Sequence, residues 1–200
     1  MADSLVVLRA GSTDFDLQGR IRGTLDLPLC AAGLAEAQAA AATLAGAPPA
    51  AIYSSPDACS LDTARLVARA CGLRARRLDD LANLDQGLWQ GMLVDDIRLK
   101  QPRLYRQWQD NPWAISPPEG EQLEDACGRV EGALERMLRR HPSGRIAVVV
   151  PAPLDQIVRW LTAGESIGDL WGRGPAESAV TDIPLAAQWK RPATLEKARV

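Results

Sequence analysis

The fold is decided by the stretch Ser4-Leu-Val-Val-Leu-Arg-Ala-Gly-Ser-Thr13, in which a short apolar run turns into a polar loop. Residues 5–8 are uniformly apolar and are predicted to form a buried strand. Arg9 and Gly11 follow at its carboxyl end, with Ala10 between them. In open α/β sheets, ligands bind at the carboxyl ends of the strands. The stretch therefore predicts a functional site beside Arg9.

Further apolar segments alternate between strand and helix patterns. The clearest strand is Ile146-Ala-Val-Val-Val150, a run without a polar face, as in strands that are covered on both sides. The clearest helix is 121–140, where apolar residues recur every three or four positions. The other predicted elements are strands at 51–54, 75–78 and an edge strand at 179–183, a loop at 11–28, and helices at 31–45, 55–71, 93–109 (interrupted at Pro102) and 154–161.

This alternation predicts an α/β fold. Because the strongest strands lack a polar face, we expect a three-layer α/β/α arrangement with a mostly parallel central sheet. The length of 200 residues suits one hydrophobic core, and no linker or repeat divides the chain. We expect residues 1–200 to form a single domain, with a peripheral tail after about residue 184.

The composition is that of an ordinary globular protein, and it argues against some partners. Hydrophobic residues make up 46% and charged residues 24% of the chain, and the net charge is −2. This balance provides no basic field for nucleic acid or for an anionic membrane surface. The amino terminus lacks the basic and apolar regions of a signal peptide. We therefore expect no nucleic-acid or membrane partner.

The cysteines argue for a reducing compartment. They show no C-x-x-C or Cys/His spacing, so we expect reduced thiols in a cytoplasmic protein. Carboxylates that could gather near the strand ends are scattered, and the ligand spacing that marks a catalytic metal is missing. We expect neither a metal nor another cofactor. The four cysteines are Cys30, Cys59, Cys71 and Cys127.

Several short motifs in a fixed order resemble the histidine phosphatase superfamily, which includes the cofactor-dependent phosphoglycerate mutases. The resemblance extends from about Leu5 to Leu161 and implies an open α/β sheet with helices on both faces. No single motif is specific, but their joint order is. The motifs are Leu8-Arg-x-Gly-x-Thr13, Gly19-Arg-Ile-x-Gly23, Asp26-x-Pro-Leu29, Gly33-Leu34, Ile52-Tyr-Ser-Ser-Pro56, Thr63-Ala64, Gly87-Leu-Trp-Gln-Gly91, Pro118-Glu-Gly-Glu121, Asp125 and Arg129-Val130.

The resemblance implies a phosphoryl-transfer site, but both histidines of that site are replaced. In the family the first strand ends in Arg-His-Gly, and this histidine becomes phosphorylated; here the place reads Arg9-Ala10-Gly11. The second histidine follows the last central strand, where this chain has Val150-Pro151-Ala152. A methyl group cannot attack phosphorus. The single histidine, His141, lies just past a predicted helix end, where we expect a solvated residue.

Other positions of the implied phosphate pocket also differ. The second phosphate-contacting arginine of the family is matched by Cys59, the proton-donating acid by Asn83, and the loop asparagine by Asp16. Arg9 remains, and it either binds an anion with the help of Arg20 and Arg22 or pairs with Asp16 and closes the site. The remnant phosphate-pocket positions are therefore Arg9, Ala10, Asp16, Arg20, Cys59, Asn83 and Pro151.

These replacements favour a catalytically inactive member of the family, a binding or regulatory module rather than an enzyme. Removing one well-placed charged donor from such a site costs about 3 kcal/mol, so several removals leave no useful catalysis. The alternative is an enzyme with different chemistry in the remodelled cleft, based on Cys59 or on a metal. The expected partner is a small anionic ligand near Arg9 or another protein, and the oligomeric state stays open.

Overall fold

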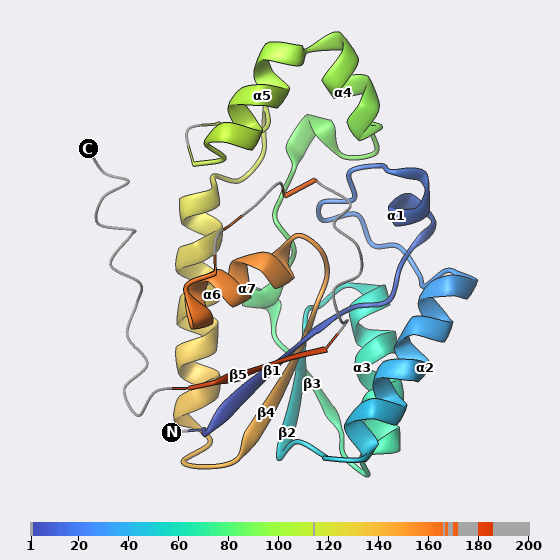
Figure 1. The fold of residues 1–200 in the computed structure, drawn as a ribbon, viewed down its shortest axis with the longest axis vertical. Helices are drawn as coiled ribbons and strands as arrows, with labels where there is room; N and C mark the ends of the chain where they lie inside the picture. The colour runs from blue at the N-terminus through green and yellow to red at the C-terminus, as the bar shows by residue number, and fades with distance from the viewer. Residues whose placement is uncertain (1, 114, 166, 168–169, 172–179, 186–200) are drawn as a thin grey trace.

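The computed structural model describes residues 2–113, 115–165, 167, 170–171 and 180–185 (Figure 1). These residues form one sheet with the strand order β3-β2-β4-β1-β5. Neighbouring strands among the first four are parallel, and the last strand runs antiparallel to β1. The strands are β1 (Ser4–Arg9), β2 (Ala51–Ser54), β3 (Ala75–Arg77), β4 (Arg145–Val150) and β5 (Val180–Pro184).

Helices cover both faces of the sheet, and the side chains of β1 show why. Val6 and Leu8 pack into the apolar cluster beneath α2 (Ala31–Ala45) and α3 (Ala58–Ala70). Leu5 and Val7 point the other way, into the cluster beneath α6 (Leu123–Arg139) and α7 (Leu154–Ala163). Figure 1 shows the sheet between these two pairs of helices. A central strand therefore needs apolar residues at every position, and the predicted three-layer α/β fold with a mostly parallel sheet is confirmed.

Short elements gather at one end of the molecule. The helices α4 (Val94–Lys100) and α5 (Pro102–Asp110) lie together there, and α1 (Asp14–Gln18) is nearby (Figure 1). Pro102 begins α5, as the predicted interruption of one weak helix implied. Two single 3₁₀ turns, Asp79–Leu81 and Gly87–Trp89, lie in the segment between β3 and α4. These elements surround the functional site.

The helix α1 is the main element that the predicted loop 11–28 omits. Thr13 caps it through a reciprocal capping box with Asp16, and Gly19 ends it in a left-handed conformation at φ 70°. This signature of a helix start and stop is visible in the sequence, but the helix is too short to show an apolar period.

The carboxyl-terminal predictions are only partly covered by the described residues. The edge strand predicted at 179–183 is β5, Val180–Pro184, and residue 179 lies outside the described residues. Nearly all of the tail predicted to be peripheral, residues 186–200, also lies outside them. The single-domain assignment stays a prediction. Within the described residues, no helix is long and apolar enough to cross a bilayer.

His141 is not simply solvated, as its place past a helix end suggested. Its Nε2 lies 2.9 Å from the hydroxyl of Tyr53, and the two rings meet edge to face at 5.8 Å between centroids. Burial, together with the charges of Arg76 and Arg140, lowers the pKa of His141. The histidine is partly exposed, and it also helps to hold Tyr53 on β2, a contact that the predicted solvated role does not include.

Candidate functional site

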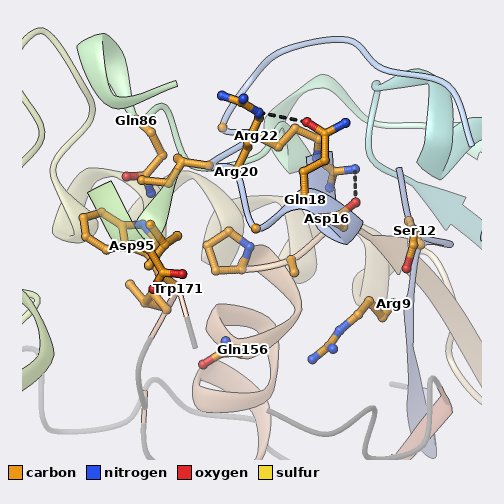
Figure 2. Close-up of a pocket in the computed structure, with 18 of the residues that line it drawn as sticks. Arg9, Ser12, Asp16, Gln18, Arg20, Arg22, Gln86, Asp95, Gln156 and Trp171 are labelled. Atoms are coloured by element: carbon orange, nitrogen blue, oxygen red, sulfur yellow. Dashed lines mark hydrogen bonds and ion pairs between the residues drawn. The ribbon is translucent and has the colours of Figure 1, made fainter. Parts of the chain in front are cut away.

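A cavity of about 480 Å³ lies at the carboxyl edge of the sheet (Figure 2). Residues from the end of β1, from α1 and the loop after it, from α4 and α5, and from the start of α7 line this cavity. Its volume is typical of sites for small molecules. Among the lining residues are Arg9, Ala10, Asp16, Arg20, Arg22 and Gln86.

The two central parallel strands, β1 and β4, bring the segments that follow them together at this edge of the sheet. Arg9 is paired in register with Val150, and the amide of Ala10 donates to the Val150 carbonyl at 2.8 Å. From this point β1 leads to α2 on one face of the sheet, while β4 leads to α7 on the other. Ligand sites of open α/β sheets form at such a switch point.

The main chain after β1 is clamped against α2. A Cβ on Gly11 would lie 2.2 Å from the Gly33 carbonyl oxygen, and a Cβ on Gly33 would lie 2.0 Å from the Ser12 carbonyl oxygen. The amide of Gly11 donates to Thr63 Oγ1 at 3.0 Å. The amide and the hydroxyl of Ser12 both donate to a carboxylate oxygen of Glu36 at 2.9 Å. Glycine is required at this close approach because any side chain would separate the loop from the helix.

Arg9 is held by a carboxylate that the sequence analysis did not place beside it. Its Nε and Nη2 both lie 2.9 Å from Oδ2 of Asp155, in the first turn of α7. The Asp155 side chain is only 1% exposed, while that of Arg9 is 32% exposed. Arg159 Nη2, one turn further along α7, also approaches Asp155 Oδ2, at 3.4 Å. Arg9 therefore reaches the cavity with much of its charge already compensated.

Asp16 takes a different role from the expected pair with Arg9, and that prediction is corrected. Its Oδ2 accepts hydrogen bonds from the amide and the hydroxyl of Thr13, both at 2.7 Å, so the carboxylate caps its own helix. The same oxygen lies 3.8 Å from Arg22 Nη1 (Figure 2). The local capping box fixes the Asp16 side chain, and Arg9 pairs with Asp155 instead.

Cys59 lies in a buried polar cluster with Arg22 and Asp57. Its Sγ accepts a hydrogen bond from Arg22 Nη1 at 2.7 Å and donates one to Asp57 Oδ1 at 2.9 Å. Burial is the main cause that raises the pKa of the Cys59 thiol to about 12, and the Asp57 carboxylate adds to it. A fully buried thiol that stays protonated at neutral pH cannot act as a nucleophile. The Cys59-based alternative loses its support.

The charges around this thiol stabilise one another. Burial favours the uncharged form of Asp57, but hydrogen bonds from Cys59 and Ser55 and the charge of Arg22 hold the pKa of Asp57 below its usual range. Burial likewise opposes the charge of Arg22, yet its partners, Asp16 and Asp57 among them, raise the pKa of Arg22. Arg22 is 6% exposed and lines the cavity, so a permanent cation borders it there.

The remaining predicted positions lie around this cavity. Ala10 is 8% exposed and lines the cavity with its methyl group. Pro151 is buried, and its carbonyl accepts the amide of Asp155 at the start of α7. Asn83 Nδ2 donates to the carbonyls of Gly23 and Ala152, at 2.9 and 3.0 Å, so it joins two lining segments. Arg20 donates from Nε to Gln18 Oε1 and from Nη1 to the Gly91 carbonyl. The roles of these positions in a phosphate pocket stay predictions.

The loop that carries Asn83 is fastened by the Arg129 cluster, which we define as Arg129, Glu121 and the carbonyls of Asp80, Ala82 and Asn83. Arg129 Nε and Nη2 lie 2.6 and 2.8 Å from the two carboxylate oxygens of Glu121. Its Nη1 donates to the carbonyls of Asp80 and Ala82, and its Nη2 donates to that of Asn83 at 3.0 Å. One guanidinium thus fixes the backbone of residues 80–83, which lead to Gln86 in the cavity lining.

Sequence reasoning missed two residues of the site and undervalued a third. Asp155 is one of the scattered carboxylates near the strand ends, and the sequence analysis gives it no place beside Arg9, although an acid in the first turn of a helix after a buried strand is a signal. Arg22 was treated as a helper of Arg9, and Gln86 carried no signal at all. Within the described residues, no cluster of three or more histidine, cysteine or acidic side chains could hold a metal ion.

The comparisons with known proteins agree with this geometry. The sequence profile of the histidine phosphatase superfamily (branch 1) matches residues 5–188. Phosphoserine phosphatase 1 of Hydrogenobacter thermophilus is 29% identical over 170 residues, which cover 85% of this chain and 81% of that protein. A bifunctional protein of Mycobacterium tuberculosis is 32% identical over 166 residues, covering 82% of this chain and 45% of that protein. The chain spans less than half the length of that second relative.

A solved structure gives the same result. The mycobacterial glucosyl-3-phosphoglycerate phosphatase, complexed with VO₃, superposes with a TM-score of 0.79 at 25% identity, covering 90% of this chain and 92% of that one. Phosphoserine phosphatase 1 and the protein of this solved structure are both named as phosphatases, and this contradicts the expectation that the chain is not an enzyme. That expectation gave more weight to Ala10 and Pro151, which stand in place of the two family histidines, than to the sequence similarity of the whole chain.

Proposed function

The chain belongs to the histidine phosphatase superfamily, and on this basis we propose that its cavity recognises a small phosphorylated molecule without forming a phosphohistidine at residue 10. The phosphate group lies against Arg9 and Arg22 at the carboxyl end of β1. The replacement of histidine by Ala10 removes the nucleophile after which the family is named, while the cationic walls of the cavity remain.

The observation that carries this proposal is the position of Arg22. Members of the family place a second arginine at the position of Cys59, and this chain has a thiol there. The guanidinium of Arg22 lies 2.7 Å from that thiol and lines the same cavity as Arg9. A cation from the loop after α1 thus replaces a cation from α3. Planar guanidinium groups suit the oxygens of a phosphate.

The charge balance of the cavity supports an anionic ligand. Arg9 pairs with Asp155, Arg22 with Asp16, and Asp95 with Arg98. Arg20 also lines the cavity, and it forms no ion pair with any residue that the structure describes. The lining residues themselves carry three arginines and two aspartates, an excess of one positive charge that favours a negatively charged ligand, while Asp57 and Asp155 offset part of this charge from behind the lining.

The chemistry that this cavity can perform follows from its side chains. In this proposal water attacks the phosphorus, the bond from phosphorus to the leaving oxygen breaks, and a proton of that water passes to the leaving oxygen. Neither Ala10, which offers a methyl group, nor the buried and protonated Cys59 thiol supplies a nucleophile. We place the protein in the cytoplasm, a proposal that its four free cysteines support.

Calorimetry with inorganic phosphate and phosphoserine tests this proposal, since one relative carries the name phosphoserine phosphatase. We expect Arg22→Met to weaken the binding of both probes about tenfold or more, the value of one charge-assisted contact. Arg22→Lys keeps the buried charge and guards against misfolding, and we expect an intermediate loss. Arg65→Met removes an exposed arginine of α3 that pairs with Asp62 and should change nothing.

The reaction is followed in the same samples. We expect any release of phosphate to proceed without an acid-labile phosphoenzyme, which rapid quenching with labelled substrate would detect. Failure of the wild-type protein to bind either probe, or equal binding by Arg22→Met, would contradict the proposal. Trapping of a phosphohistidine would contradict its chemical part.

A further inference from the structure

The side chain of Gln86 is a buried amide whose hydrogen-bonding atoms are not paired within the fold. The residue is 1% exposed, and neither Oε1 nor Nε2 has a hydrogen-bond partner among the residues that the structure describes. Buried amides in proteins are almost always paired, since an unpaired one loses its bonds to water without replacement. Gln86 nevertheless lies in the wall of the cavity.

The location of Gln86 assigns it to one end of this cavity. Figure 2 shows Gln86, Asp95 and Trp171 on one side and Arg9 and Ser12 on the other. A molecule whose phosphate lies against Arg9 and Arg22 would therefore extend its remaining part toward Gln86. The torsions at the end of a glutamine side chain are broad, so a small rotation turns the amide toward such a molecule.

Aromatic rings border the same end. Trp171 and Tyr105 both line the cavity, and their rings are stacked with 25° between their planes. Trp171 also stacks on the buried Trp108 at 4.6 Å between centroids and 15° between planes. These rings form a firm apolar wall, which suits a flat ring system better than a flexible polar chain.

From these observations we infer that the Gln86 end of the cavity binds a flat ring that carries a hydrogen-bond donor beside an acceptor, as nucleobases do. The carboxamide of Gln86 offers an acceptor and a donor in one plane, so it forms two parallel hydrogen bonds with such an edge. This inference rests on the proposed function, since it takes the phosphate end as given. The ligand class is then a nucleoside monophosphate or a molecule of that shape.

Binding measured by calorimetry with paired probes tests the inference. Ribose 5-phosphate carries the phosphate without a base, adenosine carries a base without the phosphate, and the four common nucleoside 5′-monophosphates carry both. We expect at least one nucleotide to bind the wild-type protein about tenfold or more tightly than ribose 5-phosphate, a factor that corresponds to about 1.4 kcal/mol. In Gln86→Leu this preference should disappear, while the affinity for ribose 5-phosphate stays unchanged.

A matched variant controls for the loss of an amide as such. Gln156→Leu removes an amide from the α7 side of the same cavity and should keep the nucleotide preference. Gln86→Glu keeps the size and an acceptor but loses the donor, so it should lose the preference even if Gln86→Leu folds poorly.

The outcomes separate the two proposals. Binding of ribose 5-phosphate with no preference for any nucleotide, or a preference that survives in Gln86→Leu and Gln86→Glu, overturns the inference alone. If neither ribose 5-phosphate nor any nucleotide binds, while adenosine binds and Gln86→Leu abolishes this binding, the proposed phosphate site is wrong and the inference stands. If no probe binds, both are overturned.

Discussion

The Arg129 cluster fixes the loop between β3 and α4, and the same loop contributes Gln86 to the cavity wall. The polar atoms are paired in the cluster and unpaired at Gln86. In the cluster, Arg129 donates to both oxygens of Glu121 and to three backbone carbonyls. In the cavity wall, both amide atoms of Gln86 have no partner among the described residues. Asn83 Oδ1 and Asp155 Oδ1, whose residues contact the lining but do not belong to it, have none either. Asn83 lies between the two regions, since its carbonyl accepts from Arg129 and its side chain donates to the Ala152 carbonyl.

This difference separates polar groups that stabilise the fold through hydrogen bonds from polar groups that remain available to a ligand. Paired buried groups rigidify a structure, whereas each unpaired one costs stability that other interactions must supply. Gln86 places two such atoms at the cavity, while others, such as Ser60 Oγ and Trp108 Nε1, lie away from it. The comparison therefore indicates that Arg129 fixes the backbone of this loop, while the side-chain amide of Gln86 in the same loop keeps its hydrogen-bonding atoms unpaired.

The largest effect is expected for Arg129→Met. This change leaves Glu121 and three backbone carbonyls without their donor, and we expect a loss of about 3–5 kcal/mol in the free energy of unfolding. Chemical denaturation measures it. Arg136→Met is the matched control on the same helix, because Arg136 makes an exposed ion pair with Asp80. The control should cost about 1 kcal/mol at most. Equal losses in the two variants would remove the distinction between the regions.

Asp155→Asn should have the next largest effect. The change removes the negative charge shared by Arg9 and Arg159, and we expect a loss of about 2 kcal/mol in stability. The same change frees the charge of Arg9, so phosphate should bind roughly tenfold more tightly in calorimetry. Asp182→Asn, which breaks the exposed pair with Arg145 on β5, should leave both quantities unchanged. Weaker phosphate binding by Asp155→Asn would show that Arg9 needs its partner to be useful.

The buried thiol predicts a specific dependence on pH. Burial raises the pKa of Cys59 from 9.0 to about 12, so the folded protein holds this proton more tightly than the unfolded chain. The resulting stability is complete below about pH 9 and is lost as the pH rises toward 12. Between pH 8 and pH 10 the wild-type protein should therefore lose about 1 kcal/mol more than Cys59→Ala. Parallel denaturation at the two pH values checks this, with Cys30→Ala as the control. Equal losses in the wild-type protein and Cys59→Ala would mean that the thiol is not isolated from water.

The smallest effect on stability is expected for Gln86→Leu. Since the amide of Gln86 has no partner to lose, its removal should leave the unfolding free energy unchanged or raise it by up to about 1 kcal/mol. Gln90→Leu serves as the comparison, because Gln90 accepts from the amide and the hydroxyl of Thr24. That variant should lose about 1 kcal/mol. A loss in Gln86→Leu as large as in Gln90→Leu would place Gln86 with the paired groups.

The layers of the fold could be predicted because they follow from local patterns. The unbroken apolar run of β4 indicates a strand buried on both faces, and the spacing in α6 indicates one apolar stripe. A cavity does lie beside Arg9, at the end of a buried strand, whereas the assignment of Cys59 and Asn83 to a phosphate pocket stays a prediction from motif order. These signals need only a few neighbouring residues or a fixed order along the chain.

The pairings at the site could not be predicted, since they depend on residues that are far apart in sequence. Arg9 and Asp155 are separated by 146 positions, and only the register of β1 and β4 brings them together. Arg22 reaches Cys59 across 37 positions through a loop with no periodic pattern. Gln86 looks like any loop glutamine until its burial is known. The expectation that the chain is not an enzyme was wrong for a different reason. It gave a few replaced residues more weight than the similarity of the whole chain to named phosphatases.

The clamp between Gly11 and Gly33 has a consequence for how this protein can change over generations. Backbone contacts on both sides of residue 10 hold its position, namely the bond from its own amide to Val150 and the packing of Gly11 against α2. Its methyl group lines the cavity but is only 8% exposed and belongs to the apolar cluster beneath α2 and α3, so a larger side chain has to extend toward the cavity. A substitution at residue 10 that extends into the cavity therefore costs less folding stability than one at residue 11, where a Cβ would collide with the Gly33 carbonyl oxygen. Reactivity at this place can therefore change through substitution of one residue while the scaffold persists.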